Sequence, residues 1–233
     1  MKSPIYLKFP IPLVSICTPT YNRAHMLDNW ATFIDLQRYP KNRIEVLVAN
    51  DSTDNTSDKL LSLKDKLPNL RVFNFDGKNS NGLKRQWLID RADGDILIHF
   101  DDDDYYFRDR IRNAVGALQN SQKLIAGHSK LYVWHMGAQK MTQSGPHGEN
   151  HACCGSFAYK KEYTKLHKFS DVNQGPEPGF TNRFKEPMIQ LDHLKSMICI
   201  NHGKNTVKKI PGIAAPHIKT LINNPEILKL YVK

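Results

Sequence analysis

The sequence has no long apolar run. Apolar stretches such as residues 96–100 are strand-sized and fall well short of the ~18 residues that cross a bilayer as a helix. Residues 1–12 contain three prolines and no apolar segment of the kind found in a signal peptide. We therefore expect no transmembrane segment and no secretory leader.

Cysteine is also scarce, with four residues in 233. This number is too small for a disulfide scaffold, and no pair has the C-x-x-C spacing of a zinc site. Adjacent Cys153 and Cys154 are poorly placed to bridge each other, because disulfide geometry is demanding. We expect Cys17, Cys153, Cys154 and Cys199 to be reduced thiols, and the chain to be a soluble protein of a reducing, cytoplasmic compartment.

Basic residues are in excess but are not clustered. Thirty-three Lys and Arg against 23 Asp and Glu give a net charge of +10, which attracts anions of several kinds, including phosphorylated small molecules. The sequence has no run of five basic residues, and no helix-turn-helix, zinc-finger or RNA-binding aromatic signature. A nucleic-acid partner is therefore not expected, and the oligomeric state stays open.

Short apolar runs and amphipathic stretches alternate through the first half. The runs predict strands, the first of them ended by Pro19, and the amphipathic stretches predict helices. Strands and helices that alternate in this way indicate an α/β fold with a mostly parallel sheet and helices on both faces. The predicted strands are residues 13–17, 44–49, 70–75 and 95–100, and the predicted helices are residues 26–36, 54–67, 82–92 and 105–119.

The second half is less regular. It predicts a strand over residues 123–134 with a kink at Gly127, a strand over 154–159 and a short helix over 163–169. A loop-like stretch then covers residues 169–187, a strand ends near residue 200, and a terminal helix covers 225–232. No linker divides the chain, so we predict one domain over residues 1–233 with halves 1–120 and 121–233.

Polar loops follow three of the predicted strands, at residues 18–23, 50–54 and 101–104. Ligands of open parallel sheets bind beyond the carboxyl ends of the strands. The four consecutive aspartates of the third loop would repel one another in a cleft, and oxygen ligands of this kind suit Mg²⁺ or Mn²⁺. Lys84 and Arg85, near the start of a predicted helix, could receive phosphate. Together these residues predict a metal–diphosphate site.

Three blocks carry a resemblance to a known family. Residues 14–23 (VSICTPTYNR), 48–56 (VANDSTDNT) and 94–104 (GDILIHFDDDD) resemble family 2 glycosyltransferases of the GT-A fold, in the order and approximate spacing of that family. The resemblance covers about the first half of the chain. It implies a nucleotide-diphosphate-sugar donor, bound by residues 1–120, a divalent cation, Mn²⁺ or Mg²⁺, and inverting transfer of a hexosyl type.

The resemblance also implies roles for single residues. Pro19 and Tyr21 would flank the nucleobase, with Arg23 in the same loop, and Asp51 would accept a hydrogen bond from N3–H of uracil or thymine, which favours a UDP-sugar. Asn50 departs from the second Asp that the family often has at this position. Asp101-x-Asp103 would be the D-x-D element, with Asp102 near the ribose and Asp103 as metal ligand. Lys84 and Arg85 match the stretch that approaches the diphosphate.

The catalytic base is predicted in the second half, which would bind a glycan or glycoconjugate acceptor. Glu177 in GPEPGF (residues 175–180) is the nearest match to the acidic motif of the family, although its usual acidic neighbour is Pro178. Asp171, Glu186 and Asp192 are the competitors. His202 could close the metal or diphosphate site. A carboxylate in this place would act as general base toward the acceptor hydroxyl.

Other classes of protein also place acidic residues after a parallel strand. A phosphatase D-x-D-x-[TV] motif fails at Tyr105, and residues 18–23 lack the glycines of a nucleotidyltransferase loop. A nucleotidyltransferase-like enzyme and a non-catalytic carbohydrate- or polyanion-binding module on the same fold remain the alternatives. His147-x-Glu149-x-His151 has the spacing of a strand face, and metal binding there is not expected. Tyr132 and Trp134 could line an acceptor pocket or be buried.

Overall fold

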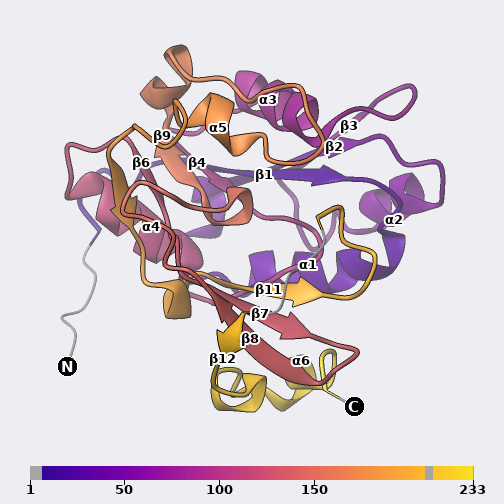
Figure 1. Ribbon diagram of the computed structural model, residues 1–233. Helices are drawn as coiled ribbons and strands as arrows, with labels where there is room; N and C mark the ends of the chain where they lie inside the picture. Colours follow the sequence, from indigo (N-terminus) through magenta and orange to yellow (C-terminus); the bar gives the residue numbers. More distant parts are fainter. Residues whose placement is uncertain (1–6, 208–211, 233) are drawn as a thin grey trace.

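The computed structural model describes residues 7–207 and 212–232. The sequence interpretation of the N-terminus therefore lies in part outside the described residues. The fold is a central seven-stranded sheet, with a second, five-stranded sheet packed beside it (Figure 1). In the described ranges no helix is long and apolar enough to cross a membrane. All four cysteines are thiols, as predicted.

The central sheet has the strand order β10-β6-β9-β4-β1-β2-β3. All neighbouring pairs are parallel except those of β9 with β4 and with β6. Every residue of β1 and β2 is buried, as in strands of a parallel sheet whose two faces are both covered. The strands are β1 (Val14–Thr20), β2 (Ile44–Asn50), β3 (Leu70–Asn74), β4 (Ile96–His99), β6 (Ile125–Gly127), β9 (Ala158–Lys160) and β10 (Met188–Gln190).

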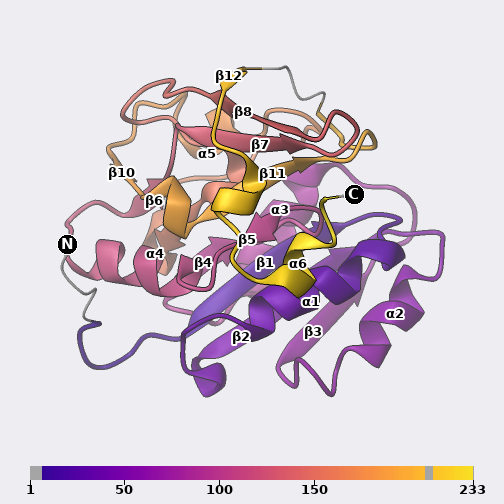
Figure 2. The same ribbon diagram turned by 90° about the horizontal axis from the view of Figure 1, so that it is seen from below.

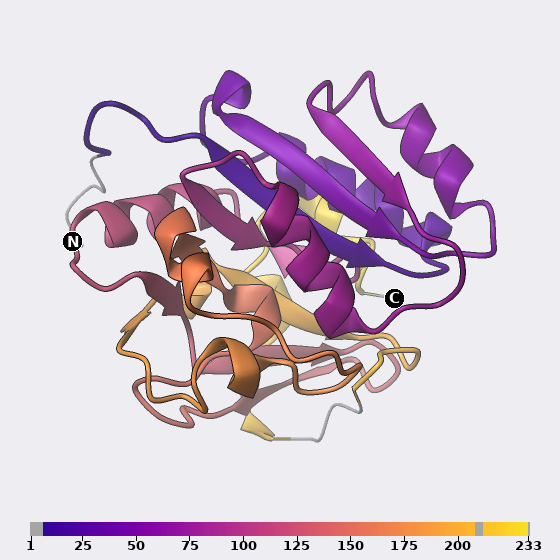
Figure 3. The ribbon, with the colours of Figure 1, turned by 90° about the horizontal axis from the view of Figure 1, so that it is seen from above.

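Helices cover both faces of the central sheet. The helices α1 (Leu27–Asp35), α2 (Thr56–Ser62) and α4 (Arg110–Gln119) pack in one hydrophobic core, on the face seen from below (Figure 2). Helix α3 (Asn81–Arg91) lies across the opposite face over β1 and β2 and belongs to a second core (Figure 3). The Ser80 side chain accepts a hydrogen bond from the Leu83 amide, a favourable N-cap that fixes where α3 begins.

The second sheet has the order β12-β8-β7-β11-β5. Its strands come from the second half of the chain, apart from β5, which follows the aspartate run. They are β5 (Tyr105–Tyr106), β7 (Leu131–His135), β8 (Lys140–Ser144), β11 (Met197–Asn201) and β12 (Ile213–Ala214). The short helices α5 (Glu177–Phe180) and α6 (Pro225–Leu228) follow in the second half, and the described residues also contain six short 3-10 segments.

The first-half expectations are confirmed in type, with three corrections. Pro19 does not end β1, which continues to Thr20. The N–H that proline lacks would face β4, and β4 pairs with β1 only as far as Cys17, so no ladder hydrogen bond is lost. Residues 105–119 are not one helix: the first two form β5 on β11, and α4 begins at Arg110. The helix expected over 54–67 covers only Thr56–Ser62, with Asn55 at the N-cap, although the Asp54 carboxylate accepts from the Thr56 amide.

Further corrections concern the second half. The single strand expected over residues 123–134 is two strands, β6 in the central sheet and β7 in the second sheet. The strand expected from residue 154 starts at Ala158, after a 3-10 turn over Cys154–Ser156. The helix expected over 163–169 is a 3-10 segment, Lys161–Lys165, and the terminal helix ends at Leu228.

Candidate active site

The carboxyl ends of β1, β2 and β4 meet at one edge of the central sheet, and a cavity of about 590 Å³ opens there. The strand arrows of β1 and β2 point to this edge (Figure 3). The cavity lies where open parallel sheets bind ligands. Its lining includes eight of the residues predicted from the sequence: Pro19, Tyr21, Arg23, Arg85, Asp101, Asp102, Asp103 and Glu177.

Three other predicted residues, Asp51, Lys84 and His202, do not line the cavity and lie behind its wall. The Lys84 ammonium is 2.6 Å from Asp51 Oδ1 and also donates to the Thr20 carbonyl. The other carboxylate oxygen of Asp51 accepts the Asn79 amide at 2.7 Å. Burial lowers the pKa of Lys84, and Asp51 opposes this shift. The buried pair therefore joins the ends of β1 and β2 to α3.

The aspartate run is not left bare, because each carboxylate that was expected to repel its neighbours has a partner. Asp101 Oδ1 accepts from Arg85 Nη2 at 2.6 Å. Asp102 accepts from the Thr20 hydroxyl at 2.5 Å, and Asp104 accepts the Ile200 amide of β11 at 2.9 Å. Burial, followed by the neighbouring charge of Asp103, raises the pKa of Asp102 to about 7. The run therefore holds β4 against β1 and β11.

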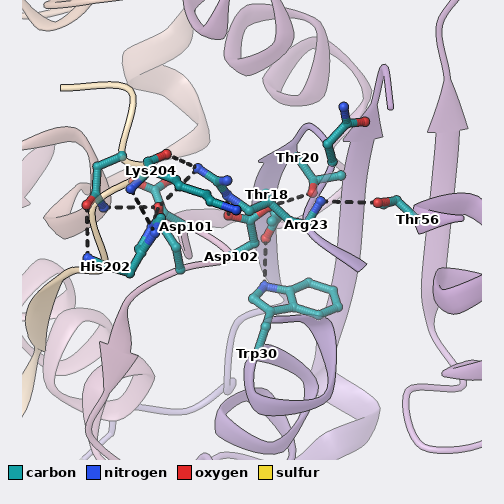
Figure 4. Close-up of polar contacts among 12 residues, drawn as sticks. Thr18, Thr20, Arg23, Trp30, Thr56, Asp101, Asp102, His202 and Lys204 are labelled. Carbon is teal, nitrogen blue, oxygen red and sulfur yellow. Dashed lines mark hydrogen bonds and ion pairs between the residues drawn. The ribbon is translucent and has the colours of Figure 1, made fainter. Parts of the chain in front are cut away.

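Arg23 lies between Asp102 and Asp103, two of the aspartates that line the cavity. Its guanidinium is 3.9 Å from Asp102 and 3.9 Å from Asp103, and Nη2 donates to the Lys204 carbonyl at 2.8 Å. The backbone amide of Arg23 donates to Thr56, so the residue connects the start of α2 with the loop after β11 (Figure 4). A fixed positive charge thus partly compensates the acids without any bound ion.

Among the aspartates, Asp103 is the first candidate to bind a divalent cation. It lines the cavity, and its Oδ2 lies 3.0 Å from His202 Nε2. The Nδ1 atom of His202 accepts the Lys204 amide, so the imidazole proton sits on Nε2 and points at Asp103. His202 in this tautomer is a hydrogen-bond donor to the carboxylate, and ligation through Nε2 would require that proton to leave.

The protein alone offers too few ligands for a complete metal shell. Within the described residues, no group of three or more His, Cys, Asp or Glu side chains is arranged to hold a metal ion. Magnesium in proteins commonly takes one or two carboxylates, with the remaining positions filled by water and substrate phosphate. Asp103 therefore fits a cation that arrives with a phosphorylated ligand and does not fit a permanently bound metal.

Glu177 is the predicted base that the structure brings to the cavity. It opens α5, lines the same cavity as the aspartates, and its Oε1 accepts the Cys154 amide at 3.2 Å. The competitors Asp171, Glu186 and Asp192 do not line the cavity. They accept from Ser80, pair with His167 and accept from the Leu194 amide, respectively. The geometry thus favours Glu177 among the four.

Several lining residues were not singled out from the sequence. Lys78 follows β3, so the rule that located the other loops could have found it; its ammonium is 4.5 Å from the Tyr21 ring centroid. Leu131, Met197 and Cys199 reach the cavity from the second sheet, whose pairing has no local sequence signal. Tyr132 and Trp134 are 7% and 0% exposed and belong to the core, as one of the two alternatives stated.

The chain resembles proteins of known activity. It is 31% identical over 94 residues to the glycosyltransferase AglE of Haloferax volcanii, covering 40% of this chain and 31% of that protein. It is 29% identical over 102 residues to the poly(ribitol-phosphate) beta-N-acetylglucosaminyltransferase TarS of Staphylococcus aureus, covering 43% of this chain and 18% of that protein. The chain thus spans less than a third of the length of these relatives.

Solved structures share the fold. The mannosyltransferase PcManGT of Pyrobaculum calidifontis, in complex with GDP-Man and Mn²⁺, has a TM-score of 0.63 at 19% identity, covering 86% of this chain and 60% of that chain. TarS residues 1–349 in complex with UDP-GlcNAc has a TM-score of 0.60 at 17% identity, covering 83% and 60%. At these identities the likeness establishes the fold, which is of the GT-A type.

The sequence model of Glycosyl transferase family 2 matches residues 15–173. This match covers more than half of the chain and includes the three blocks that carry the resemblance, apart from Val14 at the start of the first. It extends from β1 through the aspartate run to the loop before α5, so it contains most of the cavity wall. The chain belongs to glycosyl transferase family 2.

Proposed function

We propose that the chain transfers a sugar from a nucleotide-diphosphate donor, with a UDP-sugar as first candidate, to a hydroxyl of a glycan or glycoconjugate acceptor, with inversion at the anomeric carbon. One observation carries the proposal: a cationic and acidic cluster, Arg85 with Asp101 to Asp103, shares one cavity with a separate carboxylate, Glu177. The two groups match the two needs of the reaction, charge stabilisation of the leaving group and proton removal from the acceptor.

The nucleotide would occupy the end of the cavity formed by β1 and the loop after β3. Tyr21 offers an aromatic face there, and Lys78 offers a positive charge. Asp51 could accept from uracil N3–H only if the segment that covers it moved aside, since its side chain is fully buried. TarS was crystallised with UDP-GlcNAc and PcManGT with GDP-Man, so both nucleotides belong in the test.

The diphosphate would lie between Asp103 and Arg85. A divalent cation, Mn²⁺ or Mg²⁺, bound through Asp103 would neutralise charge on the departing nucleotide. Arg85, which lines the cavity and pairs with Asp101, adds a fixed positive charge, and such preorganised charges stabilise a leaving group most effectively where water is excluded. His202 holds the Asp103 carboxylate through Nε2–H.

Glu177 would take the proton of the acceptor hydroxyl as that oxygen attacks the anomeric carbon. A positioned general base contributes about 10²–10⁴-fold to such a step. The Cys154 amide, which donates to Oε1, orients the carboxylate. A single attack from the face opposite the leaving diphosphate inverts the anomeric centre.

The decisive experiment is a binding and turnover screen. UDP- and GDP-sugars are tested by thermal shift with Mn²⁺ or with EDTA, and a true donor at a hundredfold excess over its Kd should stabilise the chain by ~2.7 kcal/mol. Slow release of nucleotide diphosphate by the stabilising donor is the expected turnover. Binding without any transfer or hydrolysis would favour the non-catalytic module, and release of pyrophosphate from a nucleoside triphosphate would favour the nucleotidyltransferase alternative.

A further inference from the structure

A buried histidine that the proposed chemistry does not use lies directly behind the cavity. His99 is the last residue of β4, is 0% exposed and does not line the cavity. Both ring nitrogens make contacts: Nδ1 is 2.6 Å from Arg85 Nη1, and Nε2 is 2.8 Å from the Tyr159 hydroxyl. The remaining residues of β4 are the apolar Ile96, Leu97 and Ile98. A polar imidazole in this buried strand therefore calls for a physical explanation.

The contact with Arg85 fixes the protonation state of the ring. A guanidinium has only donors, so Nδ1 must accept and must carry no proton. The proton of the neutral ring is then on Nε2, which donates to the Tyr159 oxygen. Burial and the positive charges of Arg85 and Arg110 lower the pKa of His99 well below its ordinary value, in agreement with a neutral ring.

Arg85 depends on this acceptor. Its Nη1 meets His99, its Nη2 donates to Asp101 at 2.6 Å, and its Nε is buried without a hydrogen-bond partner. The guanidinium plane is therefore fixed by two contacts, one behind the cavity and one inside it. Without His99, two of the three nitrogens would be buried with no acceptor, and an unpaired buried donor is costly.

We propose that His99 is a positioning residue: its unprotonated Nδ1 holds the Arg85 guanidinium in the orientation that meets Asp101 and the diphosphate of the donor. The proposal rests on the proposed function for the identity of that ligand. It requires an acceptor at the Nδ1 position and does not require an imidazole as such. It therefore separates His99 from a histidine that only fills space in the core.

Three variants test the proposal. His99→Phe keeps the ring and removes the acceptor, His99→Asn places an oxygen near the former Nδ1, and Tyr159→Phe removes the contact on the other side of the ring. Donor Kd with Mn²⁺ is measured by calorimetry, and kcat, KM and thermal midpoint are measured in parallel. We expect His99→Phe to weaken donor binding by about tenfold or more, as for loss of a hydrogen bond to a charged group, with a lower kcat.

The other two variants act as controls. His99→Asn should recover most of the donor affinity, and Tyr159→Phe should bind donor like the wild type. A purely structural role would lower the thermal midpoint of His99→Phe and His99→Asn alike and leave donor Kd unchanged in both, and that result would overturn the proposal. Failure of the wild-type chain to bind any nucleotide sugar would instead count against the proposed function.

The contact between Arg85 and His99 can also be tested by NMR on the protein without any ligand. Long-range proton–nitrogen NMR on the ¹⁵N-histidine protein, assigned with His99→Asn, should show His99 with a protonated Nε2 and a bare Nδ1 from about pH 5 to pH 8. Arg85→Met should shift the Nδ1 resonance, because it removes the donor. A protonated Nδ1, or an Nδ1 signal indifferent to Arg85→Met, would contradict the contact on which the proposal is built.

Discussion

At the residue scale, the four aspartates after β4 have four different tasks. Asp101 pairs with Arg85, Asp102 accepts from Thr20, and Asp104 accepts the amide of Ile200 on the second sheet. Asp103, whose carboxylate contacts His202 and Asn205 of the loop after β11, is the residue that we propose as the ligand of a cation. A run of identical residues thus combines structural contacts with one position suited to metal.

A pair of variants separates donor binding from transfer. Asp103→Ala should abolish metal-dependent donor binding, because it removes the carboxylate that would hold the cation. Glu177→Gln should leave donor binding intact and lower kcat by about 10²-fold or more, because an amide cannot take the proton of the acceptor. Calorimetry with UDP and Mn²⁺ on both variants, with transfer assays in parallel, decides; unchanged affinity in Asp103→Ala would refute the ligand assignment.

A second prediction concerns the buried pair of Lys84 and Asp51. Their side chains are 2% and 0% exposed. Removing one partner of such a pair typically lowers the free energy of unfolding by about 3–5 kcal/mol, because the other charge stays buried without its partner. Lys84→Met should therefore destabilise the chain strongly in urea denaturation. The double variant Lys84→Met with Asp51→Asn should recover part of the loss, whereas additive losses would argue against coupling between the two residues.

At the element scale, local signals located most of the first half. Strands β1 and β2 were predictable because they are buried on both faces, and the loops that follow them could be placed at one sheet edge without a structure. The local pattern predicts a helix at Tyr105 and Tyr106, because their pairing partner, β11, lies some ninety residues away in sequence. Pairing at that distance leaves no periodic trace in the chain.

The site was predictable to the same extent as its elements. Residues supplied by the ends of β1 and β4 line the cavity as expected, whereas Leu131 and Met197 depend on the second sheet, which the sequence did not indicate. The sequence indicates Lys84 and His202 as site residues. It does not indicate that each lies behind the cavity wall and contacts a carboxylate, Lys84 that of Asp51 and His202 that of Asp103. Side-chain direction follows from packing, which a motif does not specify.

Helix α3 and the loop that leads to Glu177 are joined at Gly82, and this contact gives a third prediction. A Cβ at Gly82 would lie 1.7 Å from the Ser170 carbonyl oxygen, so Gly82→Ala must push residues 170–172 away from α3. Asn173, further along this loop, and Glu177, the first residue of α5 after it, line the cavity. We expect a loss of about 1–3 kcal/mol in stability and a larger proportional loss of transfer.

The matched control is Gly137→Ala, where a Cβ would meet nothing within 4 Å. Denaturation and transfer assays on the two alanine variants make the comparison. Wild-type transfer in a folded Gly82→Ala protein would show that the contact between α3 and the loop does not set the position of Glu177.

At the scale of the whole molecule, the two sheets share one boundary, and His128 lies at it. The residue follows β6 of the central sheet, just before β7 of the second sheet. Its Nδ1 donates to the Lys130 carbonyl and its Nε2 accepts from Ser196, which directly precedes β11. The ring is 2% exposed, so a neutral imidazole connects the sheets whose junction forms the cavity.

This connection should make folding sensitive to acid. Burial, followed by the charge of Arg110, lowers the pKa of His128 to about 3, while an unfolded histidine titrates near its ordinary value of 6.5. Between these values the unfolded state binds more protons than the folded state, so stability falls as the pH falls. Asp102, whose pKa is raised to about 7, makes stability rise as the pH falls, which opposes the effect of His128. The contribution of His128 is therefore read from the difference in pH dependence between wild type and a His128 variant.

His128→Asn keeps a donor for the Lys130 carbonyl and removes the titrating ring, so it should be less stable at neutral pH but lose less stability in acid. The difference in slope between wild type and variant should approach about 1.4 kcal/mol per pH unit well below pH 6.5. Urea denaturation of wild type and His128→Asn at several pH values between about 4 and 7 measures this difference. If stability depends on pH in the same way in wild type and in His128→Asn, the His128 ring takes up a proton in the folded state as readily as in the unfolded state. The two sheets would then be joined in acid through a charged contact instead of a neutral one.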